Sequence, residues 1–197
     1  KLNIQFITKW FFISIILGGI CGVIGAFFHI SVDYVTELRI FHSWICYLLP
    51  LGGLLIVFLY HSVKLDYDPG TNTIIQSVRQ QNKVPLLLAP AIFLATIITH
   101  LVGGSSGREG AALQIGGSLA TGIGRILHAD KKEMSILIMC GMSAVFSALF
   151  GTPITATLFA MEVVSVGIFY YAALVPCLCS SLVSLYIAKL LGCQAVQ

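Results

Sequence analysis

The chain has 197 residues, of which 57% are hydrophobic and only 10% are charged, and its mean hydropathy is +0.95. Soluble domains carry about 25% charged residues, so this composition predicts an all-α integral membrane protein. The formal net charge of +3 is small and gives no sign of a nucleic-acid partner. The pattern predicts one transmembrane domain over residues 1–197, with no soluble domain at either end.

Long apolar runs predict membrane-spanning helices, since a helix needs about 20 apolar residues to cross a bilayer. The predicted spans are residues 10–35, 43–63, 84–102 and 167–191. Two further apolar segments, 134–150 and 154–166, fall short of a full crossing. Polar residues are expected at the ends of these helices or outside them: Asp33, Glu37 and Arg39 where the first span exits to water, and Asp130–Glu133 in a surface loop.

Helix signals stand at two of the breaks. Asp68–Pro69–Gly70 predicts a turn, after which Thr71 or Asn72 caps a short helix through Val78. Gly151 is expected to end one helix, with Thr152 capping the next and Pro153 at its first position, where a missing N–H costs nothing. Full-length helices therefore alternate with short, glycine-broken ones. Broken backbone at membrane depth is tolerated where protein buries it or where it lines a water-filled path.

Small residues predict close helix packing rather than chemistry. Gly18, Gly22 and Gly25 lie near one face of the first span and favour close approach by another helix. The cysteines lie mostly in apolar runs without zinc spacing, so they are interpreted as packing residues, and no metal or cofactor is expected: Cys21, Cys46, Cys140, Cys177, Cys179 and Cys193.

The stretch THLVGGSSGREGAALQIGG, residues 99–117, places Arg108 and Glu109 among glycines. A charge at mid-bilayer costs about 2.5–3.5 kcal/mol on insertion scales. In a structural reading, Ser106 and Glu109 form a capping box and Arg108 pairs with another buried acid. In a functional reading, backbone N–H groups at the start of a glycine-rich helix form an anion site. Glu109 would then compete with a diffusing anion until it is protonated or displaced.

Glu162 is the one charged residue between Met134 and Ala188. It is either a paired or protonated acid at a helix contact, or a relay facing water, and the sequence leaves both readings open.

Two motifs together resemble the CLC family of chloride channels and proton-coupled anion antiporters. GREG followed by LQIGG is the first, and GMSAVFSALFGTPITATLFAMEV, residues 141–163, is the second. The similarity covers roughly residues 70–166. It implies a CLC-type fold with tilted and broken half-helices, transport of halide anions across a cell membrane, a homodimer, and no enzymatic activity. A bacterial plasma membrane is the expected location.

The resemblance also implies roles for single residues. Glu109 matches the family's gating glutamate, and Gly107, Arg108 and Gly110 match its anion-site loop, near residues 104–111. Gly70, Thr71 and Asn72, in a second loop near 70–74, match the loop whose serine hydroxyl contacts the central anion.

Departures from the chloride pattern favour fluoride. Ala111 stands where chloride proteins usually have proline, and Asn72 offers an amide N–H₂ in place of the serine hydroxyl. Both changes resemble the bacterial fluoride-exporting branch, so fluoride export is favoured, with a passive chloride channel as the alternative. Val163 occupies the position of the antiporters' inner proton glutamate, which leaves channel behaviour or another proton route open.

The resemblance covers only the first of the family's two inverted repeats. We therefore expect a fragment, or a half that needs a second repeat, and a non-transporting half-subunit is a remote alternative. GSSG, Gly104–Gly107, also matches the G-x-S-G of rhomboid proteases, but their chemistry needs a histidine on a later helix. His128 is the only histidine that follows Ser106 in the chain.

Overall fold

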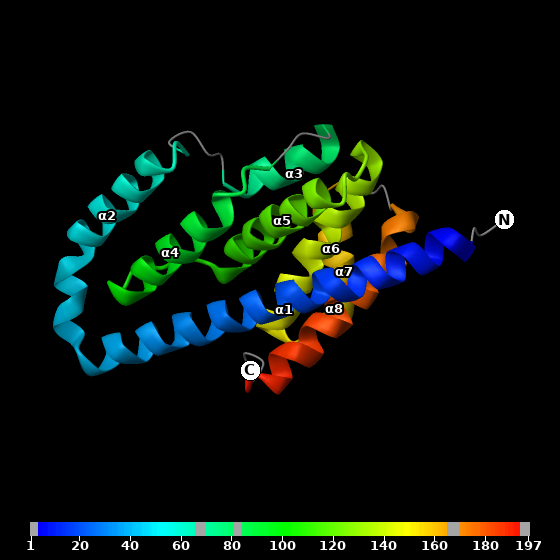
Figure 1. Ribbon diagram of the computed structural model, residues 1–197. Helices are drawn as coiled ribbons and strands as arrows, with labels where there is room; N and C mark the ends of the chain where they lie inside the picture. The colour runs from blue at the N-terminus through cyan, green and yellow to red at the C-terminus, as the bar shows by residue number, and fades with distance from the viewer. Residues whose placement is uncertain (1–3, 66–69, 81–83, 165–169, 194–197) are drawn as a thin grey trace.

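The computed structural model describes residues 4–65, 70–80, 84–164 and 170–193, and within these ranges every regular element is a helix (Figure 1). In chain order they are α1 (Ile4–Phe41), the 3₁₀ helix η1 (Ser43–Leu48), α2 (Leu49–Ser62), α3 (Thr71–Gln80), α4 (Leu88–Leu101), α5 (Arg108–Ile126), α6 (Lys131–Phe150), α7 (Pro153–Val164) and α8 (Tyr171–Leu190).

Length divides these helices into two groups. Among the described residues, four segments are long and apolar enough to span a membrane: Thr8–Phe41, Ser43–Ser62, Lys131–Phe150 and Tyr171–Leu190. The predicted span at 84–102 is wrong in extent, because α4 has only 14 residues and starts after Pro85. The segment predicted as too short at 134–150 is also wrong, since α6 has 20 residues. At 12 residues, α7 is short as predicted.

The extra length of α6 comes from its amino-terminal cap. Asp130–Glu133 was expected to be a loop, but the Glu133 N–H donates to the Asp130 carboxylate at 2.7 Å and the Asp130 N–H donates to the Glu133 carboxylate at 3.4 Å. This capping box satisfies two backbone donors and starts the helix at Lys131. Lys9 of α1 forms an ion pair with Glu133 and holds this end of the bundle together.

Other predicted boundaries are confirmed or shifted by up to about two turns. Gly151 ends α6 in the left-handed conformation, with φ of 70°, and α7 begins at Pro153. α3 begins at Thr71, so Thr71 and Asn72 are its first helical residues rather than caps, while residues 66–69 lie outside the described part. α1 continues to Phe41, which places Glu37 and Arg39 on its last turns instead of beyond its end.

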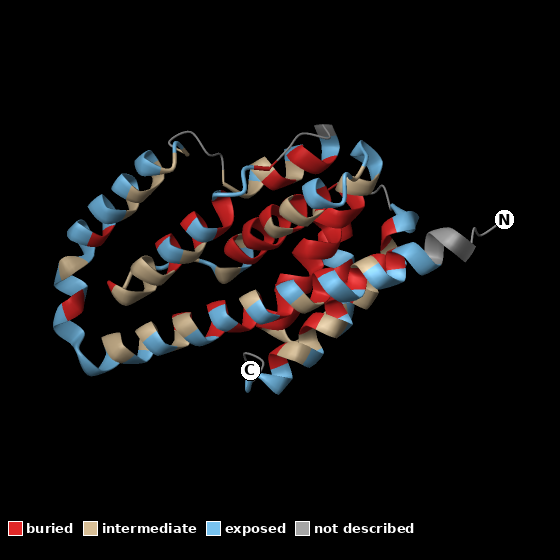
Figure 2. Ribbon diagram, viewed as in Figure 1, coloured by how far each residue is buried: buried red, intermediate tan, exposed pale blue. Residues whose placement is uncertain are grey.

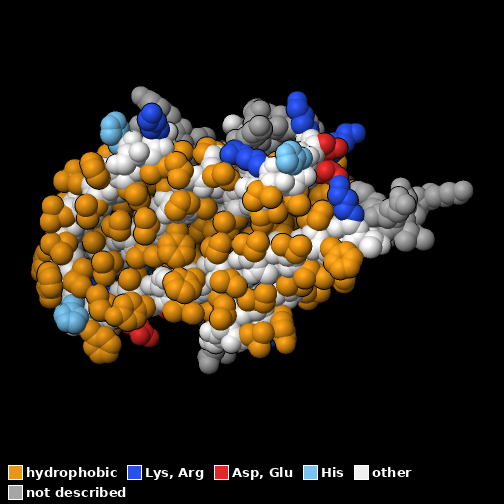
Figure 3. Space-filling model, in the orientation of Figure 1, with side chains coloured by type: hydrophobic (Ala, Val, Ile, Leu, Met, Phe, Trp, Pro, Cys, Tyr) orange, Lys and Arg blue, Asp and Glu red, His pale blue; other side chains and the backbone are white. Residues whose placement is uncertain are grey.

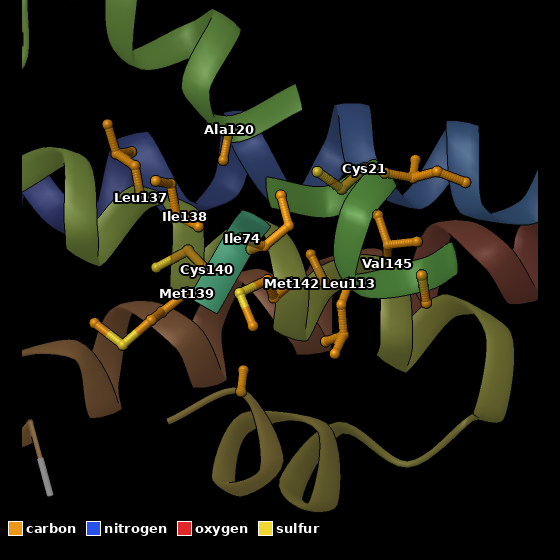
Figure 4. Close-up of a cluster of buried hydrophobic side chains, with 14 of the residues drawn as sticks. Cys21, Ile74, Leu113, Ala120, Leu137, Ile138, Met139, Cys140, Met142 and Val145 are labelled. Carbon is orange, nitrogen blue, oxygen red and sulfur yellow. The ribbon is translucent and has the colours of Figure 1, made fainter. Parts of the chain in front are cut away.

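The core is built around α6. This helix packs against α1, α3, α5, α7 and α8, and 78% of its span is buried, against 11% for the span that contains α2 (Figure 2). Apolar side chains of α1, α3 and α5 meet it in one cluster, which includes Cys21, Ile74, Leu113 and Met142 (Figure 4). α2 therefore presents its apolar side chains outward, to lipid or to further protein.

Glycines set the closest helix contacts. A methyl group added at Gly116 of α5 would lie 2.2 Å from the Gly141 carbonyl oxygen of α6, so the two backbones are in direct contact there. At Gly18 and Gly22 of α1, an added methyl group would lie 2.5 Å from Ser180 and 2.9 Å from Ser184 of α8, so these contacts are also too tight for a side chain. The predicted close-packing face of the first span is confirmed.

Hydroxyl groups join α6 to α8 along the same interface. Ser180 donates to the Cys140 carbonyl at 3.1 Å and Ser184 to the Ala144 carbonyl at 2.7 Å. In the opposite direction, Ser143 donates to the Cys177 carbonyl at 3.3 Å and Ser147 to the Ser181 carbonyl at 2.9 Å. We call these four serines the hydroxyl seam. Interhelical hydrogen bonds of this kind contribute on average about 0.6 kcal/mol each in a membrane protein.

The α5–α6 contact makes a testable prediction about stability. Gly116→Ala should destabilise the fold by at least about 1–3 kcal/mol, because the new methyl group meets backbone that cannot move without separating the helices. Unfolding in mixed micelles with increasing sodium dodecyl sulfate would measure it. Gly53→Ala in α2 is the matched control, since nothing lies within 4 Å of its added methyl group. Equal effects of the two substitutions would contradict the prediction.

Candidate functional site

The amino terminus of α5 is open. The chain turns at Gly103, with φ of 86°, and Gly107 takes an extended conformation as the N-cap residue. No side chain caps this end, so the capping box predicted for Ser106 and Glu109 is wrong. The first four N–H groups of a helix have no partner within it, and the helix dipole adds partial positive charge at the same place. This end of α5 can therefore accept an anion.

Glu109 folds back over this helix end. Its Oε2 atom lies 2.6 Å from the position that a Cβ atom would take on Gly107, so a side chain at residue 107 would displace the carboxylate. Glu109 is exposed and stands in the first turn of α5. A negatively charged group thus already lies at the amino terminus where a free anion would bind.

The structure brings the two predicted anion loops together. The Thr71 hydroxyl oxygen lies 3.0 Å from the position of a Cβ atom on Gly110, so the start of α3 touches the first turn of α5. Gly70 precedes it with φ of 69°, and Asn72 follows as an exposed residue. Ala111 is buried beside Gly110. Among the predicted site residues, Thr71, Gly107, Glu109 and Gly110 are therefore neighbours.

Arg108 is tied to α1. Its Nη1 atom donates to Asp33 Oδ1 at 2.8 Å, and the other oxygen of the same carboxylate lies 3.3 Å from His29 Nε2. Arg108 does pair with an acid as the structural reading predicted, but the prediction of a buried partner is wrong, because the Asp33 side chain is 47% exposed. Arg108 thus fixes the loop before α5 to a neighbouring helix.

Sequence reasoning missed Asp33 and His29 as site-supporting residues. A signal was present, since His29, Asp33 and Glu37 recur at four-residue spacing on one face of an otherwise apolar helix. They line a cavity of about 380 Å³ that also contacts Cys193. Burial and, next, the Asp33 carboxylate raise the pKa of the Cys193 thiol, so it stays protonated at neutral pH.

A second cavity, of about 290 Å³, lies directly against the α5 amino terminus. Gly107, Gly110, Ala111 and Gln114 form its α5 wall, and it is completed by Ile56, Tyr60, Ile92, Ala95, Thr96, Thr99 and Ser106. We call it the α5 cavity. No local pattern indicated Gln114 as a site residue, because a lone glutamine in an apolar helix belongs to no motif.

Glu162 and Val163 lie elsewhere. Both are half-buried on α7, which packs against α3, α6 and α8, and neither lines the α5 cavity. The protease reading also fails on geometry. Ser106 and His128 flank opposite ends of the 19-residue α5, a separation of about 28 Å along a helix that rises 1.5 Å per residue.

Comparison with known proteins identifies the family. A sequence profile described as voltage-gated chloride channel matches residues 52–196. The chain belongs to this family, the CLC proteins. A crystal structure of a CLC-type fluoride/proton antiporter superposes with a TM-score of 0.91 at 31% identity, over 99% of this chain and 50% of that one. The fold is therefore the amino-terminal half of the CLC architecture.

Two curated relatives also match nearly the whole of this chain over less than half of their own length. A chloride/fluoride channel protein of Pseudomonas syringae pv. tomato is 35% identical over 182 residues, covering 92% of this chain and 40% of the relative. An uncharacterized protein of Methanocaldococcus jannaschii is 27% identical over 192 residues, covering 94% of this chain and 45% of the relative. The chain thus spans less than half the length of either.

The Arg108–Asp33 pair leads to a prediction about stability. Asp33→Asn should destabilise the fold by about 0.5–1 kcal/mol, because Arg108 loses its charged partner, and the effect should shrink at high salt. Denaturant titration in detergent at low and high ionic strength would measure it. Glu37→Gln, one turn further along the same face of α1 and outside this ion pair, should change stability less; a loss as large as that of Asp33→Asn would refute the assignment.

Proposed function

We propose that this chain forms the first half of a CLC-type pathway that moves small halide anions across a cell membrane, with Glu109 as its gate. The observation that carries the proposal is the uncapped amino terminus of α5, with the Glu109 carboxylate folded over Gly107 and the start of α3 against Gly110. Membership of the CLC family supports it.

The physical basis is competition between two anions for the same donors. The free N–H groups of the first turn and the helix dipole stabilise whichever negative charge lies closest. While Glu109 is ionised, its carboxylate occupies this region. Protonation removes its charge, and a halide ion can then replace it. Glu109 thereby couples anion occupancy to pH.

We propose fluoride as the preferred ion. Fluoride is smaller and more strongly hydrated than chloride, so its site needs stronger donors. Asn72 offers an amide N–H₂ group beside Thr71 where a hydroxyl would be the chloride pattern. The names of a relative, a chloride/fluoride channel protein, and of a structural neighbour, a fluoride/proton antiporter, support this preference.

The proton route is proposed to run through Glu109, because Val163 replaces the inner acid that chloride antiporters place after the residue matching Glu162. A valine cannot carry a proton. Passive anion conduction is the alternative that this residue favours. Proton uptake measured together with anion efflux separates the two, since a passive channel moves none.

Charge distribution supports an orientation in the membrane. Hydrophobic side chains cover most of the face in Figure 3, and basic side chains gather toward one end of it. That end holds Lys9, Arg79, Arg125, Lys131 and Lys132 beside Asp130 and Glu133, whereas Asp33, Glu37 and Arg39 lie on the last turns of α1. By the positive-inside rule, the basic end faces the cytoplasm. The remaining pathway would come from a second repeat.

Glu109→Gln tests the gate. In liposomes containing the complete two-repeat protein, this change should abolish the pH dependence of halide efflux, because glutamine cannot ionise. An ion-selective electrode for fluoride and one for chloride would record the rates. Glu37→Gln is the control and should keep the pH dependence. Unchanged efflux and pH dependence in Glu109→Gln would remove Glu109 from the gate.

Asn72→Ser tests the selectivity. Replacing the amide donor by a hydroxyl should reduce the ratio of fluoride to chloride efflux by about three- to tenfold, the value of one hydrogen bond. Gln76→Ser, one turn further along α3 and exposed, should leave the ratio unchanged. If the wild-type protein carries chloride as fast as fluoride, the fluoride preference is wrong.

A further inference from the structure

The side-chain carbonyl of Gln114 is a buried acceptor that has no partner among the described residues. Its side chain is 6% exposed, and its Oε1 atom makes no hydrogen bond to any described residue. Leaving a buried acceptor unpaired costs about 1–3 kcal/mol, so native proteins fill such sites with a donor. Gln114 stands four residues after Gly110 and seven after Gly107, which places all three on one face of α5 toward the α5 cavity.

The chemistry of the cavity restricts what can bind there. A carbonyl oxygen accepts hydrogen bonds, so it cannot hold a bare anion directly. Among the described residues, no charged side chain lines the cavity, and the positive end of the α5 dipole faces it, which disfavours a cation. A neutral donor remains, and the volume of about 290 Å³ is ample for water, which takes about 30 Å³ per molecule in the liquid.

A water at Gln114 would have the partners that it needs. Buried waters typically make about three hydrogen bonds. One O–H group can donate to Gln114 Oε1, and Thr96 and Ser106 line the same cavity as further polar groups. Its second O–H group is then free to point toward the Gly107–Gly110 turn, where the anion is proposed to bind.

We propose that Gln114 holds a water molecule that remains on the anion as part of its hydration shell. This inference rests on the proposed function and deepens it. A strongly hydrated ion such as fluoride loses more hydration free energy than chloride does when its last waters are removed. A site that retains one water lowers that cost for fluoride selectively. Gln114 thus becomes a specificity-determining residue that acts through water instead of touching the ion.

Gln114→Met tests the proposal in the complete two-repeat protein, because methionine keeps the length of the side chain and removes the acceptor. Fluoride affinity, measured by isothermal titration calorimetry, and fluoride efflux should both fall by about three- to tenfold. Chloride affinity and efflux should change by less than about twofold. Gln76→Met, a change at an exposed position on α3, is the control and should leave the affinity and efflux of both ions unchanged.

A merely structural role predicts a different result. Damage to the fold would reduce the affinity and efflux of fluoride and chloride equally, and equal losses would overturn the proposal. A fluoride-bound structure of the wild type supplies a readout that does not depend on the variant folding. Density for a water within hydrogen-bond distance of Gln114 Oε1 supports the proposal, and a protein donor from the second repeat at that position overturns it.

The two hypotheses fail in different ways. If the wild type carries fluoride and Gln114→Met is indistinguishable from it, only the water site is wrong. If the wild-type protein carries no halide, the proposed function is wrong and the water site falls with it.

Discussion

The contact between the backbones of α5 and α6 at Gly116 and Gly141 is the constraint on which the rest of the molecule depends. α6 is the central helix, and α5 can lie against it so closely only because neither residue has a side chain at the crossing. This contact fixes the tilt and depth of α5. The open amino terminus of α5, two turns before Gly116, therefore lies at a set position relative to α6.

The two charged residues at that terminus serve separate purposes because of helix geometry. Successive residues in a helix point about 100° apart, so Arg108 and Glu109 cannot face the same way. Arg108 reaches α1 and pairs with Asp33, whereas Glu109 turns back over Gly107. One charge anchors the turn, and the other stays in the region that an anion would enter.

Local patterns predicted the helical breaks better than the partners across them. Gly151–Pro153 contains its own stop and start signals, and the structure confirms both. At Asp130–Glu133 the D-x-x-E signature was present, but the run of charges suggested a loop, whereas at Ser106 the same type of signature misled because the extended Gly107 is the N-cap. The Asp33–Arg108 pair joins residues 75 positions apart, and such pairing depends on tertiary packing that no local pattern encodes.

The hydroxyl seam has a mechanical consequence. Its serines bond backbone carbonyls in both directions between α6 and α8, so a slide of one helix past the other by a single residue breaks every bond of the seam at once. The hydrogen bonds therefore hold α6 and α8 in one fixed register. Side chains at the start of α5 and the few residues before it take no part in the seam, so they can move without breaking it.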